Sequence, residues 1–316
     1  MRQSVELENA MLSVERLLLY SKIETEGVDT EEGDAADAAA DAAARAAGVP
    51  AGWPRTGAIE LRNVAMRYRR DGEAAAAAAA GGLPFALRGV SLVIPAGSRL
   101  GVCGRTGAGK SSLLAALLRL SEPERTGADG GCGVMIDGVD AALVPLTRLR
   151  RAMSVVSQEP VLYQGTVRSN LDPLARSSDA ACVAALAACA LGRLALDAPV
   201  SESGGNLSVG ERQLLCLARA VLRGTKIVLV DEATANVDPD TDALIQAALR
   251  SAFAGSTIIA VAHRLSTILD YDAVAVLGDG RVIEHGPPAG LAAREGSAFA
   301  ALLHEASVKE KRHARA

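Results

Sequence analysis

The sequence predicts an α/β fold built around a largely parallel sheet. The runs "KIVLVD" (226–231) and "STIIAVA" (256–262) are continuously apolar, as expected of strands that are buried on both faces. The run "SRLGVC" (98–103) precedes a glycine-rich turn and then a helical segment, an order typical of α/β proteins. With 316 residues, 49% of them hydrophobic, the chain is long enough for one large or two modest units with a real core.

Composition and charge exclude several classes of protein. A net charge of −4 and 3% aromatic residues argue against a nucleic-acid surface, which needs a basic face or stacking rings. The five cysteines show no Cys-x-x-Cys spacing, so neither a disulfide framework nor a zinc site is indicated, and we expect a reducing, cytosolic setting. They are Cys103, Cys132, Cys182, Cys189 and Cys216.

The first residues predict an exposed amphipathic helix over 5–23, within an N-terminal segment 1–28. Its apolar positions at helical spacing are Leu7, Met11, Val14 and Leu18. Glu6, Glu8 and Glu15 lie where a signal peptide would need apolar residues, and no charge-free run of 18 apolar residues follows. We therefore expect that the chain itself neither spans a membrane nor enters the secretory route.

The next segment, 29–56, contains a low-complexity stretch of Ala and Asp, which predicts a linker or a frayed helix with a domain boundary near Trp53. Beyond it, 57–306 is expected to form the folded domain. The β-rich runs 58–68, 89–95 and 272–277 supply further strands. The alanine-rich run 72–82 is expected to be a surface-loop insertion, and 307–316 a solvated basic tail.

The stretch "GRTGAGKSS" (104–112) predicts a phosphate-binding loop. Its glycines let successive backbone N–H groups turn inward, and the following helix N-terminus adds its positive dipole end. Glycine-rich turns alone are common, but the full G-x-x-x-x-G-K-S pattern between strand and helix favours nucleotide binding. In this interpretation Lys110 reaches the β and γ phosphates and Ser111 ligates Mg²⁺. The residues expected to cradle the phosphates are Gly104, Thr106, Gly107, Gly109, Lys110, Ser111 and Ser112.

An acidic pair ends the strand "KIVLVD". Asp231 at the carboxyl end of this strand is placed to reach Mg²⁺ beside Ser111, whereas Glu232 faces the other way and can polarise water as a general base. An adjacent acid pair after a strand is equally compatible with a cluster at a helix N-cap. The phosphate loop upstream favours the functional interpretation.

The run "NLSVGERQLLCLARAVL" (206–222) joins a Ser-x-Gly turn to a helix start, which makes a second place for phosphate at a helix N-terminus. One nucleotide cannot occupy both places. The second element is therefore expected to face a nucleotide held by a partner domain, in a head-to-tail pair.

Together "GRTGAGKSS", "LSVGERQ", "VLVDEATANVD" and "VAHRLSTI" resemble, in order and spacing, the ATP-binding cassette of an ABC transporter. More narrowly, "VPAGWPRTGAIELRNVAMRYR", "SNLDPL" and "DEATANVDPDTDALIQ" resemble the second, C-terminal cassette of the C subfamily, the multidrug-resistance-associated proteins. The resemblance covers nearly all of residues 5–305, including the first helix, which in that family continues from the last transmembrane helix. It implies an α/β P-loop NTPase fold with an antiparallel β subdomain that grips adenine and an α-helical signature subdomain at about 160–222.

The resemblance also assigns roles to residues that would carry little meaning alone. Tyr68 matches the aromatic residue that stacks on adenine; otherwise it would be ordinary packing. Gln158 matches a loop glutamine that touches Mg²⁺ and the attacking water, and His263 matches the switch histidine on the γ phosphate. Ser208 and Gly210 match the signature turn that clamps the partner's ATP. Asp238 matches the loop that runs across the dimer.

Two positions depart from the general signature. Val209 stands where the general pattern has glycine, although a valine there is usual for the second cassette of the C subfamily. Glu211 stands where the pattern has glutamine, and its negative charge beside a triphosphate is expected to weaken the clamp.

The resemblance implies an ATPase that uses ATP and Mg²⁺ to drive export of organic anions or conjugates. Its partners would be a first nucleotide-binding domain and transmembrane domains, with no nucleic acid. The cassette would lie at the cytoplasmic face of a plasma or vacuolar membrane. It would associate with the membrane only through those transmembrane domains, and this chain alone would be soluble. Two alternatives stay open: a regulatory nucleotide sensor of a channel-type C-subfamily member, and a soluble ABC ATPase without a membrane partner.

Overall fold

The computed structural model of the chain describes residues 2–21, 34–68, 84–124, 132–231, 237–262 and 264–313. The expected insertion at 72–82 and the positions Glu232 and His263 lie outside the described residues.

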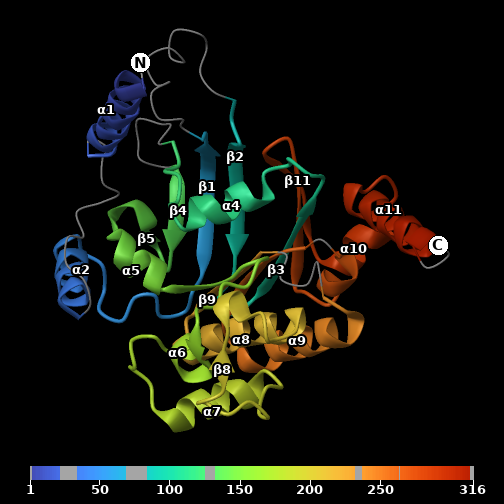
Figure 1. Cartoon of the computed structure of the whole chain (residues 1–316). Coiled ribbons are helices and arrows are strands. Elements are labelled where there is room, and N and C mark those ends of the chain that lie inside the picture. The colour runs from blue at the N-terminus through green and yellow to red at the C-terminus, as the bar shows by residue number, and fades with distance from the viewer. Residues whose placement is uncertain are drawn as a thin grey trace.

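The larger sheet has six strands in the order β12-β11-β3-β10-β9-β6 (Figure 1). All neighbouring pairs are parallel except β11 with β12 at one edge. The expected parallel sheet is thus confirmed, including its predicted strands β3, β9, β10 and β11. In sheet order the strands span Arg281–Gly286, Ala273–Gly278, Arg99–Gly104, Thr257–Val261, Ile227–Asp231 and Met153–Val156.

A second sheet of four antiparallel strands has the order β2-β1-β4-β5. It confirms the antiparallel part expected near the N-terminus. In sheet order its strands span Leu87–Ile94, Ile59–Met66, Gly133–Ile136 and Val139–Asp140. A further short pair joins β7 (Gly165–Thr166) to β8 (Pro199–Val200).

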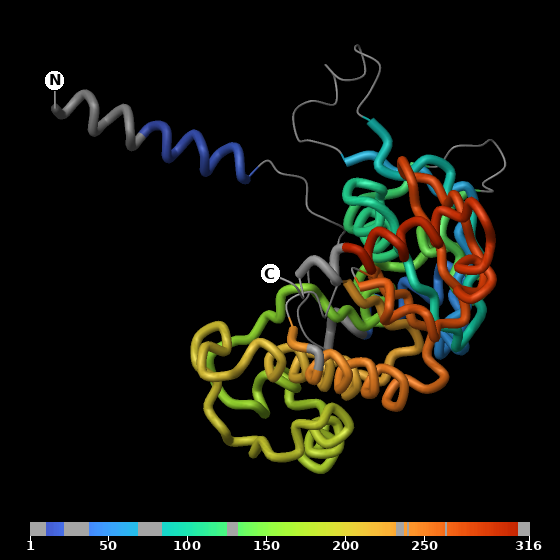
Figure 2. Tube along the Cα trace, turned by 90° about the vertical axis from the view of Figure 1, so that its right-hand side faces the viewer, coloured from blue at the N-terminus to red at the C-terminus, as the bar shows by residue number. Residues whose placement is uncertain are grey.

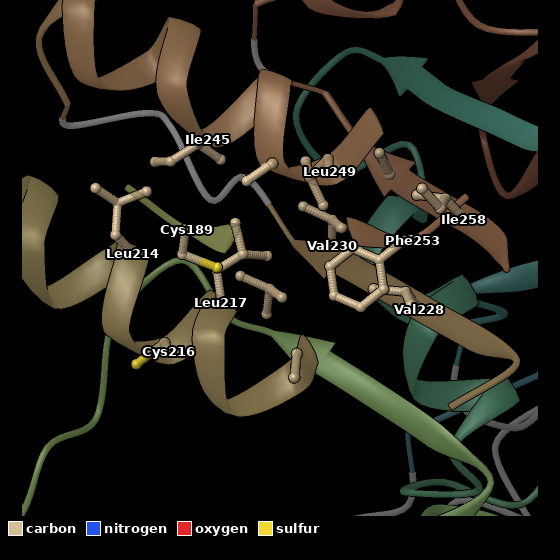
Figure 3. Close-up of a cluster of buried hydrophobic side chains, with 14 of the residues drawn as sticks. Cys189, Leu214, Cys216, Leu217, Val228, Val230, Ile245, Leu249, Phe253 and Ile258 are labelled. Carbon is tan, nitrogen blue, oxygen red and sulfur yellow. The ribbon is translucent and has the colours of Figure 1, made fainter. Parts of the chain in front are cut away.

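Buried apolar side chains form two clusters on opposite faces of the larger sheet. In β9, Ile227 and Leu229 belong to the cluster shared with the antiparallel sheet, whereas Val228 and Val230 belong to the cluster beneath the helices. Because strand side chains alternate between faces, a strand with cores on both sides reads as a continuous apolar run. Figure 3 shows the second cluster, where Val228 and Val230 lie near Leu217 and Phe253.

Helices cover these cores. Helices α6, α7 and α8 lie in the lower part of Figure 1, with α9 beside α8, and their order in the chain confirms the helical subdomain expected at about 160–222. The helices from the phosphate loop onward are α4 (Lys110–Leu117), α5 (Leu146–Arg151), α6 (Val167–Leu171), α7 (Asp179–Ala188), α8 (Val209–Arg223), α9 (Pro239–Ala252), α10 (Pro288–Ala293) and α11 (Ala298–His313). Short 3-10 helices span Ala141–Leu143, Glu202–Gly204 and Leu265–Ile268.

The N-terminal part contains two helices. Helix α1 (Arg2–Tyr20) lies apart from the rest of the chain in Figure 2, and its described side chains, 11–20, are exposed. No helix of the described residues has the length and apolar character needed to cross a membrane.

The range 29–56, expected to be a linker or a frayed helix, contains a helix that packs against the domain. Its residues Asp34–Ala46 form helix α2, which contacts α5. Ala40 and Ala44 are buried, and Asp41 pairs with Arg148 at 3.4 Å. Trp53, near the expected boundary, is also buried, and its indole N–H donates to the Ile136 carbonyl at 2.9 Å. The small methyl groups of alanine allow α2 to lie close against α5, so this segment is part of the packed domain.

Candidate nucleotide-binding site

The phosphate loop connects β3 to α4, at the carboxyl end of the central strand. Gly109 is the N-cap residue of α4 and adopts a left-handed conformation with φ 101°. A Cβ atom at this position would lie 2.9 Å from the Ala86 carbonyl oxygen, so both the backbone angle and the space require glycine. The loop therefore aims the N-terminus of α4, with its unpaired N–H groups, at the place where an anion would bind.

The only lysine of the loop, Lys110, lies back over it. Its Nζ donates to the carbonyl oxygens of Gly104 at 3.0 Å and Arg105 at 3.3 Å. Thr106 and Ser111 are exposed at the loop surface and at the start of α4. The cation and both hydroxyl groups thus belong to one short glycine-rich loop and the helix start after it, a combination suited to binding a polyphosphate.

Tyr68 follows β1 and contacts the same helix. Its hydroxyl donates to Ser112 Oγ at 3.0 Å, while Ser112 itself is buried and the Tyr68 side chain stays half-exposed. The structure therefore brings together the residue expected to stack on adenine and a residue expected to bind phosphate.

Helix α11 also reaches the phosphate loop, a contact that the sequence analysis missed. Arg105 pairs with Glu305 at 3.0 Å, across 200 positions of sequence. A cleft between the loop and α11 is lined by 104–108, by 276–279 and by Ala298, Ala301 and Leu302. No local pattern announces this contact, because the two charged residues are adjacent only in the folded chain.

Asp231 ends β9, which is separated from β3 by β10 alone. Because β3, β10 and β9 are parallel, Asp231 and Ser111 lie beyond the same edge of the sheet. A hydroxyl and a carboxylate are oxygen ligands of the kind that Mg²⁺ prefers, so the donor set fits this metal. Glu232, the neighbour of Asp231, lies outside the described residues, as does His263 after β10.

The signature turn is a helix cap. Ser208 is the N-cap of α8: its hydroxyl accepts from the Glu211 N–H at 3.1 Å, and its own N–H donates to the Glu211 carboxylate at 2.9 Å. Arg193 pairs with the same carboxylate. The bond from the Ser208 N–H, together with Arg193, lowers the pKa of Glu211. The negative charge that departs from the general pattern thus has a function within the helix start itself.

Gly210 lies where α8 meets α9. A Cβ atom there would approach Thr241 Cγ2 to 2.5 Å, so glycine is required by the space between the helices. Asp238 caps α9: its carboxylate accepts from the Thr241 N–H at 2.9 Å and from the Thr241 hydroxyl at 2.8 Å. The Thr241 N–H and then its hydroxyl lower the pKa of Asp238. Thr241, which the sequence analysis did not single out, therefore links two predicted site residues.

The loop that carries Gln158 is held by its backbone. Gln158 is exposed, and its carbonyl accepts from Gln213 Nε2 of α8 at 2.7 Å. Further along this loop, the Val161 carbonyl accepts from Arg219 of α8 at 3.0 Å. The loop after β6 is therefore attached to the helix that begins at the signature turn.

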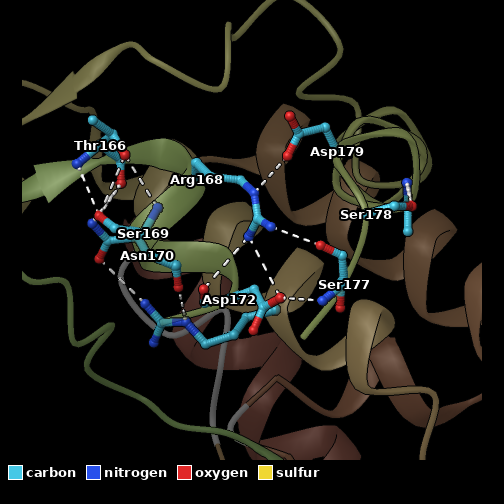
Figure 4. Close-up of polar contacts among 10 residues, drawn as sticks. Thr166, Arg168, Ser169, Asn170, Asp172, Ser177, Ser178 and Asp179 are labelled. Atoms are coloured by element: carbon cyan, nitrogen blue, oxygen red, sulfur yellow. Dashed lines mark hydrogen bonds and ion pairs between the residues drawn. The ribbon is translucent and has the colours of Figure 1, made fainter. Parts of the chain in front are cut away.

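The buried Asn170 of α6 continues this attachment. Its side-chain oxygen accepts from the Tyr163 N–H at 2.9 Å, and its Nδ2 donates to the Tyr163 carbonyl at 2.8 Å. Figure 4 shows Asn170 beside a second set of polar contacts, in which Arg168 reaches Asp179 at 2.8 Å and the Ser177 carbonyl at 2.7 Å. These contacts fix α6 and the start of α7 beneath the Gln158 loop.

Comparison with known proteins agrees with this geometry. Residues 87–235 match the family model described as ABC transporter. ABC transporter C family member 13 of Oryza sativa subsp. indica is 40% identical over 96% of this chain, and ATP-binding cassette sub-family C member 4 of Mus musculus is 41% identical over 91%. The chain spans 18% and 20% of the length of these two relatives.

Among solved structures, a bacterial Atm1-family ABC exporter with ATP bound is similar to this chain with a TM-score of 0.68. The two are 33% identical, and the match covers 79% of this chain and 42% of the exporter chain.

Proposed function

The chain belongs to the ABC transporter family, and from this membership we propose that it is the second nucleotide-binding cassette of a C-family exporter. An ABC cassette binds ATP and hydrolyses it to drive transport. Within this proposal, 57–306 forms the cassette, and the segments "SNLDPL" and "VPAGWPRTGAIELRNVAMRYR" favour the second position over the first.

One observation supports the proposal: the domain contains two separate helix N-termini that carry the two predicted phosphate-binding motifs. The first is α4, with Lys110 and the glycine loop, and the second is α8, capped by Ser208. A domain that holds a single nucleotide on α4 uses the second on ATP held by a partner, and this arrangement requires head-to-tail pairing.

We assign roles on this basis. Tyr68 stacks on adenine, and the phosphate-loop residues with Lys110 hold the triphosphate. Mg²⁺, when bound, would be held by Ser111, Asp231 and Gln158, and it supplies positive charge that offsets the phosphates.

The residues that act on the attacking water follow from the same assignment. Glu232 accepts a proton from the water as general base, and His263 donates a hydrogen bond toward the γ phosphate. Ser208, Gly210 and Asp238 face the partner's nucleotide.

The partners in this proposal are a first cassette and transmembrane domains, with the cassette at the cytoplasmic face of a plasma or vacuolar membrane. Organic anions or conjugates are the proposed cargo, by analogy with the family alone. A regulatory sensor and an ATPase without a membrane partner remain the alternatives, and neither is favoured by a described contact. ATP turnover by the assembled pair separates the exporter from the sensor.

The first prediction tests nucleotide binding. Lys110→Ala removes the cation of the phosphate loop, so we expect the Kd for ATP to rise at least about tenfold while the fold is retained. Isothermal titration with ATP measures the Kd, and circular dichroism checks the fold. A folded variant with wild-type affinity would show that Lys110 is not the phosphate ligand.

The second prediction tests the chemistry in a mixture with a first cassette that carries a Ser-Gly-Gly signature. Adding that cassette should raise ATP turnover, and Glu232→Gln should remove the gain while ATP binding persists, because the amide cannot accept the proton. Phosphate release measures the rate. Equal turnover by Glu232→Gln would exclude this residue as the base, and failure of the wild type with every first cassette would favour the sensor.

A further inference from the structure

Arg264 occupies a junction between two loops at the edge of the sheet. It directly follows His263 in the sequence, and it precedes the 3-10 helix Leu265–Ile268. Its guanidinium donates to the Asp242 carboxylate at 3.3 Å and to the Val237 carbonyl at 3.2 Å. One side chain therefore joins the segment after β10 to the segment after β9 and to the first turn of α9.

The partner carboxylate is poorly accessible to water. The Asp242 side chain is 13% exposed, and its Oδ1 has no hydrogen-bond partner among the described residues. Removal of the cation from a buried carboxylate is strongly destabilising, so this pair constrains position more firmly than an exposed pair does. Arg264, with a side chain 33% exposed, is the cation that pairs with Asp242 at this position.

Both ends of Arg264 are fixed. Its carbonyl accepts from the Thr267 hydroxyl at 2.8 Å and from the Thr267 N–H at 3.3 Å. Hydrogen bonds thus hold both the guanidinium and the backbone of Arg264, the residue that follows His263 in the sequence. A planar fork of donors suits this bridging task better than a lysine ammonium.

The other side of the junction leads to the signature turn. Asp242 is the neighbour of Thr241, whose N–H and hydroxyl bond to Asp238 and whose methyl group faces Gly210. The Asp242 N–H also donates to the Asp238 carbonyl at 2.9 Å. Contacts therefore run without interruption from Arg264 to Asp238 and Gly210.

We infer that Arg264 is a positioning residue for ATP hydrolysis: it sets the relative position of the segments that carry His263 and Asp238, and hence couples the γ-phosphate contact to the partner-facing turn. This inference rests on the proposed function. The contacts of Arg264 do not touch the phosphate loop, so its loss should slow hydrolysis without weakening ATP binding. A small displacement of reacting groups lowers the rate strongly, and we expect turnover to fall about tenfold.

The test compares Arg264→Met, Asp242→Asn and the double variant in the mixture with a first cassette. Arg264→Met leaves Asp242 buried without its cation and should lower both Tm and turnover. In the double variant the buried charge is gone, so Tm should recover, whereas turnover should stay low because the bridge to Val237 is still missing. Arg264→Lys, which keeps the charge and reaches one acceptor, should be intermediate. The Kd for ATP should stay within about twofold throughout.

Arg250→Met is the matched control. Arg250 lies on α9, the helix that also carries Asp242, and it pairs with Asp270 at 3.4 Å. Both side chains of this pair are about half exposed. Turnover and Tm should remain at the wild-type level in this variant.

Two turnover results overturn the inference: turnover of the double variant that recovers together with Tm, or wild-type turnover in Arg264→Met. Amide hydrogen exchange provides a reading that does not depend on hydrolysis. Segments 237–242 and 264–268 should exchange faster in Arg264→Met, and unchanged exchange in both would also overturn it. If the wild type turns over no ATP with any first cassette, the proposed function fails. The exchange result then decides alone whether Arg264 holds segments 237–242 and 264–268 in position.

Discussion

At the phosphate loop, single side-chain atoms determine how the nucleotide can be held. Lys110 Nζ is committed to two backbone carbonyls, at 3.0 and 3.3 Å, and the Tyr68 hydroxyl is committed to Ser112. In the proposed function, a triphosphate would replace the two Lys110 bonds with stronger, charge-assisted ones. The net gain in affinity from Lys110 would therefore be smaller than the strength of its new bonds alone.

Variants of Tyr68 separate the contribution of the ring to ATP affinity from the contribution of the hydroxyl. Tyr68→Ala should raise the Kd for ATP about tenfold, which corresponds to roughly 1–2 kcal/mol for a ring stack, whereas Tyr68→Trp should retain binding. Tyr68→Phe keeps the ring and removes only the bond to Ser112, so its Kd should change less than about threefold. Titration with ATP measures all three. A Phe variant as weak as the Ala variant would assign the affinity to the hydroxyl.

Gly210 is limited by space, so its replacement should cost stability. In Gly210→Ala the new Cβ would meet Thr241 Cγ2 at 2.5 Å, and forcing the helices apart should cost about 1–3 kcal/mol. Denaturant unfolding measures the cost. Thr241→Ala removes the contacting methyl, so the same glycine replacement should cost at most about half as much in that background.

Gly205→Ala is the control for this experiment. A Cβ atom at Gly205 would lie 3.4 Å from its nearest neighbour, an ordinary contact, and the backbone there has φ −62°. Its free energy of unfolding should change by less than about 1 kcal/mol. An equal loss at Gly205 and Gly210 would remove the steric explanation.

At the scale of elements, a partly buried carboxylate attaches the last helix to the sheet. Glu284 of β12 accepts from the Ser297 hydroxyl at 2.8 Å and from the Ala298 and Phe299 N–H groups at the start of α11. Burial alone would raise the pKa of Glu284, but these hydrogen bonds, with Arg294, lower it to about 2. The same helix then reaches the phosphate loop through Glu305.

This carboxylate predicts a pH dependence of stability. Because the folded-state pKa of about 2 lies below the ordinary 4.5, the ionised group stabilises the fold above about pH 4.5, and this contribution is lost as the pH falls toward 2. Glu284→Gln should lower the free energy of unfolding at pH 7 by at most about 3 kcal/mol.

The difference between wild type and Glu284→Gln should shrink below about pH 4.5. Urea unfolding at several pH values measures it. A difference independent of pH would mean that the carboxylate acts through shape and not through its charge.

Elements that bury both faces could be predicted from the sequence, whereas those defined by distant neighbours could not. The apolar runs of β9 and β10 predict that they are strands, and the glycine pattern after β3 predicts a phosphate-binding loop. Strand β12 has only partly buried and exposed positions, so no apolar pattern marks it. Helix α2 takes its stability from α5, about 100 residues later in the chain.

The same limit applies to the candidate site. Motif residues such as Lys110 and Ser208 were predictable because their function depends on local spacing. Arg264 and Glu305 were not predictable in this way, because each contacts a residue from another element. Thr241 bonds locally to Asp238, but its contact with Gly210 of α8 exists only in the folded chain.

At the scale of the whole molecule, the proposal that two helix starts in one domain bind phosphate predicts complementation between two inactive variants. Lys110→Ala loses its own phosphate site but keeps the Ser208 turn, whereas Ser208→Ala keeps the phosphate loop. If two copies pair head to tail, a mixture of these variants should hydrolyse ATP faster than either alone at the same total concentration. Wild-type turnover per chain should also rise with protein concentration, although Val209 and Glu211 are expected to make this pairing weak.

Phosphate release across a concentration series measures both effects. Ser208→Ala also removes a helix cap, at a cost of about 0.5–2 kcal/mol, so its fold must be checked by circular dichroism. A mixture no faster than its components would argue against a head-to-tail pair of this chain.

The order of strands in the larger sheet has a consequence for synthesis on the ribosome. β3 is complete at Gly104, but its two neighbours, β10 and β11, end only at Val261 and Gly278. At roughly 5–20 residues per second, both edges of β3 wait about 8–30 s before a native partner emerges. During that time β3 can pair with any other extended segment, and the phosphate loop that follows it lacks its final support. In the proposed function, we therefore expect nucleotide to stabilise the phosphate loop only after β10 and β11 have been synthesised.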